Sequence, residues 1–298
     1  MYSSPKALEM AVKEAAIKSP LATSRAIAGF YFHRLLYRVF SEPDTSFVLK
    51  GGLGMLARTI NARATRDIDL ATDNLDIEDA VAELRRLAAK NAGDFVTFRF
   101  IGVNPIKGDD EYRDGYTLTF EAILGAKMIQ RVSVDLVSDE ISIGEPDWVK
   151  PADRIEVGGI EVCDYPVYPA ERGVADKVCA IRERHADRPS TRVKDLLDIA
   201  VYALTEEFEA ENLRTVILRE TAARHIVLGR EFELPLEWGQ QQAEQYVKLA
   251  AKTNLPETIS TIEKALELVK QFLNPIIAGD TVSHWNHAQR AWAQSTHK

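Results

Sequence analysis

The chain has 298 residues, of which 46% are hydrophobic and 28% are charged, and its formal net charge at pH 7 is -8. This length suits one large domain or two ordinary ones, and the hydrophobic fraction is normal for a packed globular protein. The acidic balance argues against a protein that coats nucleic acid or anionic membranes non-specifically, although a local basic patch can still bind a phosphate backbone.

Neither the apolar runs nor the cysteines indicate a membrane or secreted protein. The longest apolar runs, such as residues 30–36, contain charged or polar residues and are shorter than the roughly 18 residues that a membrane span requires. Cys163 and Cys179 are the two cysteines, which suits a reducing compartment, and no signal-peptide pattern opens the chain. We therefore expect a cytoplasmic protein with no membrane partner.

The N-terminal half predicts helices and strands in alternation. Ser4 and Pro5 form an N-cap signature for a helix that ends near Lys18, and further helices are expected over residues 23–40 and 79–89. Short apolar runs between Gly, Pro and Asp clusters are typical of strands. The predicted strands are residues 46–49, 66–71, 95–103, 116–124, 128–137 and 155–162.

The C-terminal half predicts helices alone. Residues 164–169 carry two prolines, and after them apolar positions recur on one side of each predicted helix, as in a bundle. The predicted helices are residues 170–185, 192–204, 210–228, 236–253 and 256–273. We therefore expect an α+β domain with N-terminal helices at residues 1–165 and a helical domain at residues 166–298. The tail after Asp280 is expected to dock on the body or to fray.

Two carboxylates stand close together in the strand at residues 66–71. Side chains at i and i+2 of a strand point to the same face, so Asp67 and Asp69 project together while Ile68 and Leu70 face the other side. Adjacent carboxylates repel one another unless a cation lies between them, and Mg²⁺ prefers oxygen ligands. An isolated Asp-x-Asp pattern is more often a solvent-facing part of a strand.

A glycine pair gives this pattern a context. Gly51 and Gly52 end an apolar strand and open a helix, whose N-terminus presents N–H groups and a positive dipole end to an anion. No Gly-Lys-Ser/Thr follows, so this is not a Walker loop, and a plain tight turn is the alternative. Asp135 is the lone acid in the strand at residues 128–137, so it is the candidate third carboxylate of a metal site, or else an acid on a solvated edge strand.

At this point the sequence resembles a known family. Residues 48–52, Val-Leu-Lys-Gly-Gly, and residues 66–70, Arg-Asp-Ile-Asp-Leu, resemble the signature of the AbiEii/AbiGii-type nucleotidyltransferase toxins. These toxins are a branch of the DNA polymerase β-like nucleotidyltransferase superfamily, and their mycobacterial relatives are the MenT toxins. A second block resembles the family at residues 176–177, Asp-Lys, and 193–199, Val-Lys-Asp-Leu-Leu-Asp-Ile. The matched motifs extend from residue 47 to about residue 200.

The resemblance implies a polymerase β-like nucleotidyltransferase domain with a mixed sheet, followed by a helical bundle. It implies NMP transfer from an NTP with Mg²⁺, or Mn²⁺, as cofactor. The implied metal ligands are Asp67, Asp69 and Asp135, which are also catalytic together with Lys177 and Asp198. The implied nucleotide-binding residues are Lys50, Gly51, Gly52, Arg66, Lys177 and Asp195. Leu53 stands where many family members have Ser or Thr, so phosphate binding through that hydroxyl is not expected.

The residues of the second block also suggest a charge cluster independently of the family resemblance. Asp195 and Asp198 lie three residues apart and share one helix face, so they can meet Lys177 from the preceding helix. The alternative is an ordinary surface ion pair between helices, which contributes little. Arg58, Arg63 and Arg66 flank the predicted metal site and are expected to help neutralise NTP phosphates.

A basic stretch in this acidic chain is the candidate acceptor surface. Its members are Arg182, Arg184, Arg188, Arg192 and Lys194. Phosphate contacts from such side chains position a polyanion without reading its sequence, although a charge run is more often a solvated loop. By resemblance, the acceptor is RNA, at the 3′ end of tRNA, and the protein is the toxin of a toxin-antitoxin or phage-defence pair with a cognate antitoxin. The alternatives are transfer to a small-molecule or protein hydroxyl, and an inactive nucleotidyltransferase fold kept as a binding module.

Overall fold

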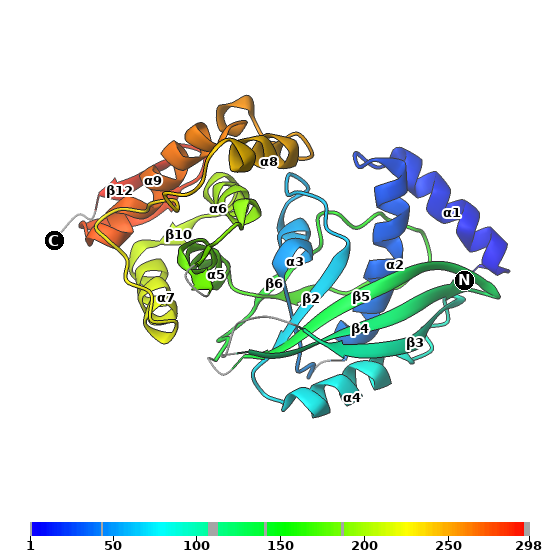
Figure 1. Cartoon of the computed structure of the whole chain (residues 1–298). Coiled ribbons are helices and arrows are strands. Elements are labelled where there is room, and N and C mark those ends of the chain that lie inside the picture. The colour runs from blue at the N-terminus through cyan, green and yellow to red at the C-terminus, as the bar shows by residue number, and fades with distance from the viewer. Residues whose placement is uncertain (1, 43, 107–112, 140–141, 186–187, 295–298) are drawn as a thin grey trace. The chain divides into compact units, whose positions relative to one another are not determined.

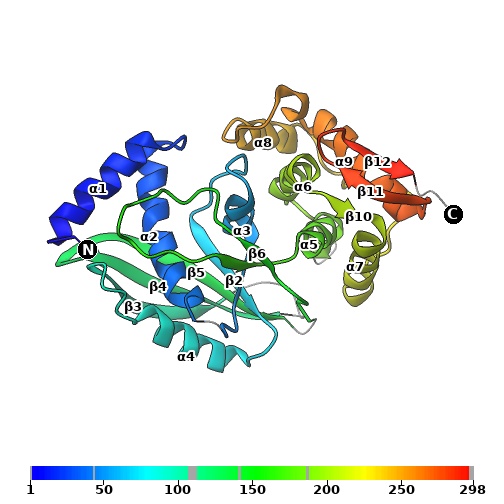
Figure 2. The ribbon, with the colours of Figure 1, turned by 180° about the vertical axis from the view of Figure 1, so that it is seen from behind.

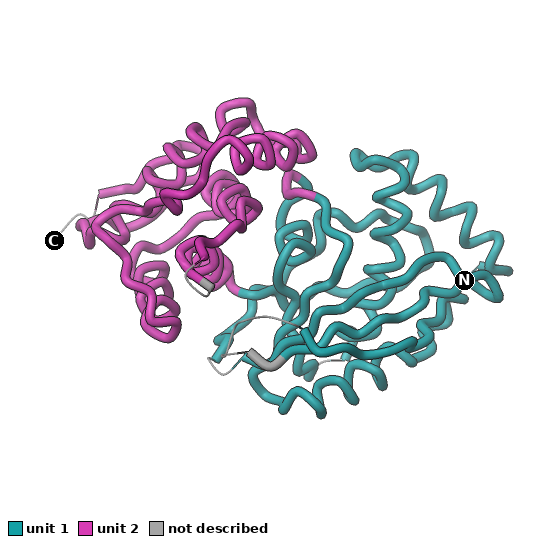
Figure 3. Tube along the Cα trace, viewed as in Figure 1, with its two compact units in different colours: residues 1–60, 64–168 teal, residues 61–63, 169–298 magenta. Residues whose placement is uncertain are grey.

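The computed structural model describes residues 2–42, 44–106, 113–139, 142–185 and 188–294. The chain divides into two compact units (Figure 3). Unit 1 comprises residues 1–60 and 64–168, and unit 2 comprises residues 61–63 and 169–298. The boundary between two domains after residue 165 stays a prediction, because compactness alone does not show that either unit folds independently.

A seven-stranded mixed sheet forms the centre of unit 1, with strand order β3-β4-β5-β2-β1-β7-β6 (Figure 1). The strands are β1 (Val48–Lys50), β2 (Asp67–Thr72), β3 (Val96–Pro105), β4 (Arg113–Leu124), β5 (Lys127–Asp139), β6 (Asp147–Val149) and β7 (Tyr165–Val167). Strand β2 runs parallel to β5 and β1 parallel to β7, whereas the other neighbours pair antiparallel. Fully buried side chains alternate along the central strands, as at Ile68 and Leu70, because one face of the sheet carries the core. The predicted α+β class with a mixed sheet is confirmed.

Four helices of unit 1 pack on this sheet and on one another (Figure 2). They are α1 (Pro5–Lys18), α2 (Thr23–Phe40), α3 (Gly51–Arg58) and α4 (Ile77–Ala88). Ser4 caps α1 as its sequence predicts, because its hydroxyl accepts a hydrogen bond of 3.2 Å from the N–H of Ala7. Helix α3 packs on β1, β2 and β7, and this contact fixes the glycine turn beside the acidic strand.

One predicted strand of unit 1 is wrong. Residues 155–162 form turns and irregular chain, although Ile155 and Val157 alternate and are both buried. The strand lies instead at β7, inside the proline-containing segment where the domain boundary was expected. Pro166 lacks an N–H, but the chain still pairs there because Tyr168 donates its N–H to the carbonyl of Leu49 at 2.8 Å.

Unit 2 is built mainly from helices. They are α5 (Ala170–Arg182), α6 (Val193–Thr205), α7 (Ala210–Ala223), α8 (Gln240–Ala250) and α9 (Ile262–Ala278), with a short 3₁₀ turn at Glu257–Ile259. Helix α6 packs against α5, α8 and α9, and its Leu196 and Leu197 are fully buried. A two-stranded hairpin of β8 (Arg184–His185) and β9 (Arg188–Pro189) connects α5 to α6.

The prediction that only helices follow residue 169 is wrong, because the tail folds into a small sheet. Strands β10 (Phe208–Glu209), β11 (Val282–Asn286) and β12 (Ala291–Gln294) pair in that order. The tail docks through Trp285, which is fully buried, lies 5.0 Å from the Phe272 ring and donates from Nε1 to the carbonyl of Ala203 at 2.9 Å.

Across the described ranges, no helix combines the length and the apolar character that crossing a membrane would require.

Candidate active site

The three predicted carboxylates lie on one face of the unit 1 sheet. In the parallel pairing of β2 with β5, Asp69 is opposite Asp135 and Asp67 is opposite Ser133. Residues paired across neighbouring strands share a face, as do residues at i and i+2 of one strand. The structure therefore brings Asp67, Asp69 and Asp135 together, while Ile68 and Val134 on the opposite face are fully buried.

Two threonines orient these carboxylates. The hydroxyl of Thr65 donates to Oδ1 of Asp67 at 2.5 Å, and the hydroxyl of Thr117 on β4 donates to Oδ1 of Asp135 at 2.6 Å. Sequence reasoning missed both threonines. Thr117 is the harder of the two to find, because it reaches Asp135 only through the antiparallel register of β4 and β5.

The carboxylates supply the donor chemistry of a metal site in an open arrangement. Three carboxylates on one face offer the hard oxygen ligands that Mg²⁺ prefers. Within the part of the chain that the structure describes, no group of three or more His, Cys, Asp or Glu side chains is gathered closely enough to hold a metal ion. The chemistry of the donor set fits a divalent cation, and holding one would require the three carboxylates to move closer together.

The glycine turn lies directly against this face. Gly51 has φ of 64°, and a Cβ atom at this position would lie 1.9 Å from Oδ2 of Asp69. A Cβ on Gly52 would lie 3.0 Å from Cβ of Thr65. Because these positions have no side chains, the first turn of α3 closely approaches the acidic strand, and the N-terminus of a helix is a ready site for an anion.

Lys50 precedes the glycines and meets an acid that sequence reasoning missed. Its Nζ lies 3.7 Å from the carboxylate of Asp139 and 5.1 Å from the ring centre of Tyr168. Asp139 is almost completely buried and lies four residues after Asp135, so the two share a face of β5. The predicted strand stopped at residue 137, which hid this relation.

The flanking arginines of unit 1 have different surroundings. Arg66 is exposed, and its backbone N–H donates to Oδ1 of Asp67 at 3.3 Å. Arg58 forms an ion pair with Asp147 and donates to the carbonyl of Tyr168 at 3.0 Å. Arg58 therefore ties α3 to β6 and to the end of β7.

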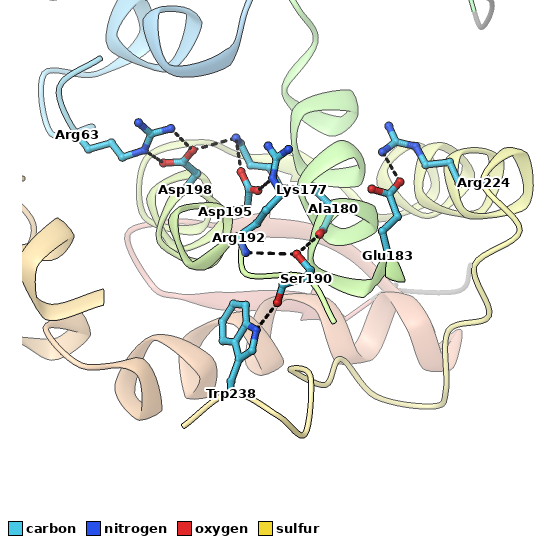
Figure 4. Close-up of polar contacts among 10 residues, drawn as sticks. All are labelled: Arg63, Lys177, Ala180, Glu183, Ser190, Arg192, Asp195, Asp198, Arg224 and Trp238. Carbon is cyan, nitrogen blue, oxygen red and sulfur yellow. Dashed lines mark hydrogen bonds and ion pairs between the residues drawn. The ribbon is translucent and has the colours of Figure 1, made fainter. Parts of the chain in front are cut away.

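A second cluster of charges lies inside unit 2 (Figure 4). Nζ of Lys177 on α5 lies 2.9 Å from the carboxylate of Asp198 and 3.5 Å from that of Asp195, both on α6. Arg63 donates to Asp198 from Nε at 3.0 Å and from Nη2 at 3.1 Å, in a two-pronged contact. Both carboxylates are 1% exposed, so the contact predicted from the spacing of residues 195 and 198 is an interior network.

Burial and charge act in opposite directions on the pKa values of this network. Burial by itself would lower the pKa of Lys177, but the carboxylates of Asp198 and Asp195 outweigh it and leave the pKa above its ordinary value. Burial would raise the pKa of Asp198, but Lys177 and Arg63 hold it below its ordinary value. Lys177 and Asp198 therefore both carry their charges through the neutral range.

Sequence reasoning placed Arg63 beside the predicted metal site, whereas the structure places it in the unit 2 network with Asp198. The segment at residues 61–63 is the only part of the first 168 residues assigned to unit 2. No local sequence pattern indicates that residues 61–63 belong to unit 2, because this assignment depends on their packing against α6.

The basic stretch of unit 2 is partly neutralised by acids. Arg182 lies 3.9 Å from the carboxylate of Glu233 and also donates to its backbone carbonyl at 3.1 Å, and Arg184 donates to the carboxylate of Glu237 at 2.9 Å. Arg192 forms an ion pair with Asp195. Two further members, Arg188 and Lys194, are exposed.

The fold of the chain is also found in a solved structure, and a second one is given with it for comparison. MenT4, the nucleotidyltransferase toxin Rv2826c from Mycobacterium tuberculosis H37Rv, matches with a TM-score of 0.55 at 14% identity, over 91% of this chain and 89% of that chain. The crystal structure of JHP933 from Helicobacter pylori matches with a TM-score of 0.46 at 14% identity, over 86% of this chain and 94% of that chain. No curated protein matches the sequence.

One family model matches most of the sequence. It describes the nucleotidyl transferase AbiEii toxin of type IV toxin-antitoxin systems and covers residues 34–280, a range that includes the three carboxylates, the glycine turn and the unit 2 network. The chain belongs to this AbiEii family and is a nucleotidyltransferase toxin, which implies an NTP substrate, typically a divalent metal, and an antitoxin partner.

Proposed function

We propose that the protein transfers NMP from an NTP to an RNA acceptor, the 3′ end of tRNA, and thereby blocks translation in the cytoplasm, where both substrates occur. The observation that carries this proposal is the register of Asp69 opposite Asp135, with Asp67 on the same face and Gly51 against Asp69. Phosphoryl transfer needs positioning and charge neutralisation more than covalent help from the protein. An anion-binding turn beside three carboxylates supplies both.

The proposed roles in unit 1 follow from this arrangement. Asp67, Asp69 and Asp135 would hold the divalent metal, Mg²⁺ or Mn²⁺, which neutralises phosphate charge when bound. The N–H groups at Gly51 and Gly52 would bind the triphosphate, with Lys50 and Arg66 nearby. The acceptor hydroxyl attacks the α phosphorus, its proton passes to Asp135, and the bond to the β-phosphate oxygen breaks to release pyrophosphate.

The proposed roles in unit 2 concern charge. Lys177 would bind nucleotide phosphate, and Asp195 and Asp198 would orient its ammonium group and keep it charged. The contacts of Lys177 with both carboxylates support the orienting role, because they hold its ammonium group in one position. For the RNA backbone we propose the basic stretch, namely Arg182, Arg184, Arg188, Arg192 and Lys194.

Two other functions remain candidates for the test. A small-molecule or protein hydroxyl could replace RNA as acceptor, because the same carboxylates would serve. An inactive fold kept for binding would be expected to have lost a carboxylate, and all three are present. The presence of the full set favours an active enzyme.

The test offers each acceptor to the same enzyme. Purified protein is incubated with Mg²⁺ and each NTP, labelled at either the α or the γ phosphate, with total tRNA, an aminoglycoside or no added acceptor. We expect α label from one NTP to enter tRNA, γ label to stay out, and an Asp67→Ala, Asp69→Ala variant to transfer none. Label in the aminoglycoside or in the protein itself would reject the RNA acceptor, and no label in any acceptor would indicate the binding module.

A further inference from the structure

A cavity of about 500 Å³ lies in unit 1 between α2, α3 and the first residues of β5. Thr65 and Arg66 are part of its wall. Both also donate hydrogen bonds to Oδ1 of Asp67, so the cavity adjoins the carboxylate face at its Asp67 side. Its volume is within the usual range of about 300–1,000 Å³ for small-molecule sites.

The lining combines an apolar floor with a cationic rim. The floor includes Phe32 from α2 and Leu53 and Leu56 from α3, all of them buried. The rim carries three guanidinium groups, from Arg25, Arg66 and Arg131. A local excess of positive charge in a chain of net charge -8 indicates an anionic ligand.

One acid in the wall, Asp153, offsets part of this excess, and the three arginines leave the lining with a net positive charge. Asp153 is buried, and its Oδ1 lies 3.3 Å from Nε2 of His33, on the inner side of α2. Arg25 is half-buried, and burial lowers its pKa while Asp153 counteracts that effect. A guanidinium that is partly removed from water gains more from a phosphate than an exposed one does.

Gly29 leaves the cavity open on the α2 side. A Cβ atom at Gly29 would have no neighbour within 4 Å, so this helical position faces space. Glycine costs stability inside a helix, and no close backbone contact requires it at this position. Space at Gly29 and an apolar floor beneath a cationic rim suit a flat base with an attached phosphate.

We propose that this cavity binds the terminal nucleotide of the acceptor RNA, with its base on the apolar floor and its phosphate near Arg25 and Arg131, while Arg66 serves the NTP. The inference rests on the function proposed above, because it names the acceptor's place in the same site. The position relative to Gly51 favours the acceptor over the NTP. Gly51 adjoins Asp69 and Gly52 approaches Thr65 in the cavity wall, so a nucleotide in the cavity would lie beside the triphosphate cradle, where an acceptor hydroxyl must lie to attack the α phosphorus.

The first test fills the cavity. In a Gly29→Trp variant the indole would occupy the floor space, and the matched control Ile17→Trp adds the same side chain on α1, where residue 17 is 72% exposed. Binding is measured for a short 5′-labelled RNA that ends in CCA and, separately, for each NTP. We expect Gly29→Trp to weaken RNA binding at least about tenfold, the loss of one good base-stacking contact, with NTP binding unchanged.

The second test removes one charge and does not depend on the first variant folding. Arg131 and Arg99 are both largely exposed, and both contact Glu121, at 3.8 Å and 3.1 Å respectively, but Arg131 alone lines the cavity. We expect Arg131→Gln to weaken RNA binding and to reduce the slope of log K against log salt by about 0.7, as for one lost phosphate contact. Arg99→Gln should change neither.

The outcomes separate this inference from the proposed function. If the wild type labels tRNA and Gly29→Trp and Arg131→Gln bind RNA as the wild type does, the cavity assignment is overturned and the RNA acceptor stands. Weaker NTP binding with unchanged RNA binding would also overturn it and assign the cavity to the donor. If the wild type labels no RNA, the proposed function fails and this inference fails with it.

Discussion

At the scale of single residues, Gly51 shows how closely the glycine turn packs against the carboxylate face. Its positive φ and its approach to Asp69 leave no room for a side chain. A left-handed conformation costs an L-residue roughly 1–2 kcal/mol before any overlap is counted. Two independent constraints therefore require glycine at residue 51. The backbone needs a residue that tolerates a positive φ, and the carboxylate of Asp69 leaves no space for a Cβ atom.

We expect Gly51→Ala to lower the free energy of unfolding by at least about 1 kcal/mol and to reduce label transfer, because the new Cβ displaces Asp69. The matched control is Gly158→Ala, since a Cβ at residue 158 meets nothing within 4 Å and needs no left-handed backbone. Urea denaturation and the transfer assay check both variants. Equal stability of the two variants would contradict the close approach at Gly51.

The buried network predicts a second single-residue effect. Asp198→Asn leaves Lys177 and Arg63 without their shared carboxylate, and breaking a buried ion pair costs about 3–5 kcal/mol. The exposed pair of Glu14 and Lys18, 2.6 Å apart, is the control, and Glu14→Gln should leave stability unchanged. If Asp198→Asn lowers the free energy of unfolding no more than Glu14→Gln does, the buried network does not stabilise the fold.

The same network predicts a pH dependence. The pKa of Asp198 is lowered by folding, so its contribution is complete above its unfolded-state pKa of about 3.9 and is lost as pH falls through the lower folded value. The pKa of Lys177 is raised, so its contribution is complete below about 10.4 and is lost only at higher pH. The stability difference between wild type and Asp198→Asn should be constant from about pH 4 to pH 10 and shrink in acid. Urea denaturation across pH measures it, and a difference that grows in acid would contradict the sign.

Much of the residue-level site could be predicted from the sequence, because strand periodicity places Asp67 and Asp69 on one face and the lone acid of β5 supplies the third. Register could not be predicted, since the pairing of β2 with β5 joins segments more than 60 residues apart. Arg63 shows the same limit, because only packing against α6 reveals its carboxylate partner.

At the scale of elements, the C-terminal sheet stabilises unit 2, although the sequence of this half predicted helices alone. Strand β11 lies between β10 and β12 and packs on α7 and α9. Its Trp285 contacts Phe272 on α9 and the carbonyl of Ala203 on α6. The tail therefore joins two helices of unit 2, α6 and α9, through one side chain.

We expect Trp285→Ala to destabilise unit 2 by about 3–5 kcal/mol, the usual cost of removing a buried large aromatic side chain. Trp148→Ala is the control, because that indole is 60% exposed and its removal should change stability by no more than about 0.5 kcal/mol. Thermal denaturation of both variants measures the difference. Similar melting temperatures would mean that the tail only rests on the surface.

The long elements followed from the sequence, whereas several of the short ones did not. Helices α1 and α2 have clear signals and appear at the predicted residues. Strands β7 and β10 have three and two residues, too few for a periodic pattern, and each forms because a distant partner strand is present. The same reasoning explains the error at residues 155–162, where the alternation is real but none of the described strands pairs with it.

At the scale of the whole molecule, the chain keeps its candidate chemistry in two places. Unit 1 holds the carboxylates, the glycine turn and the cavity beside Asp67, and unit 2 holds the network of Lys177 and Asp198. The family model spans both units, which is consistent with a need for both. The central claim remains the carboxylate face, because every other assignment depends on it.

The most direct test of that claim is the initial rate at which α label from the preferred NTP enters total tRNA in Asp69→Asn and Asp135→Asn, each compared with wild type. Asparagine keeps the shape and removes the charge, so we expect at least about a 100-fold loss, equivalent to about 2.7 kcal/mol of transition-state stabilisation. Asp79→Asn, on the exposed side of α4, is the control and should match the wild type. Undiminished transfer by Asp69→Asn or Asp135→Asn would contradict the account.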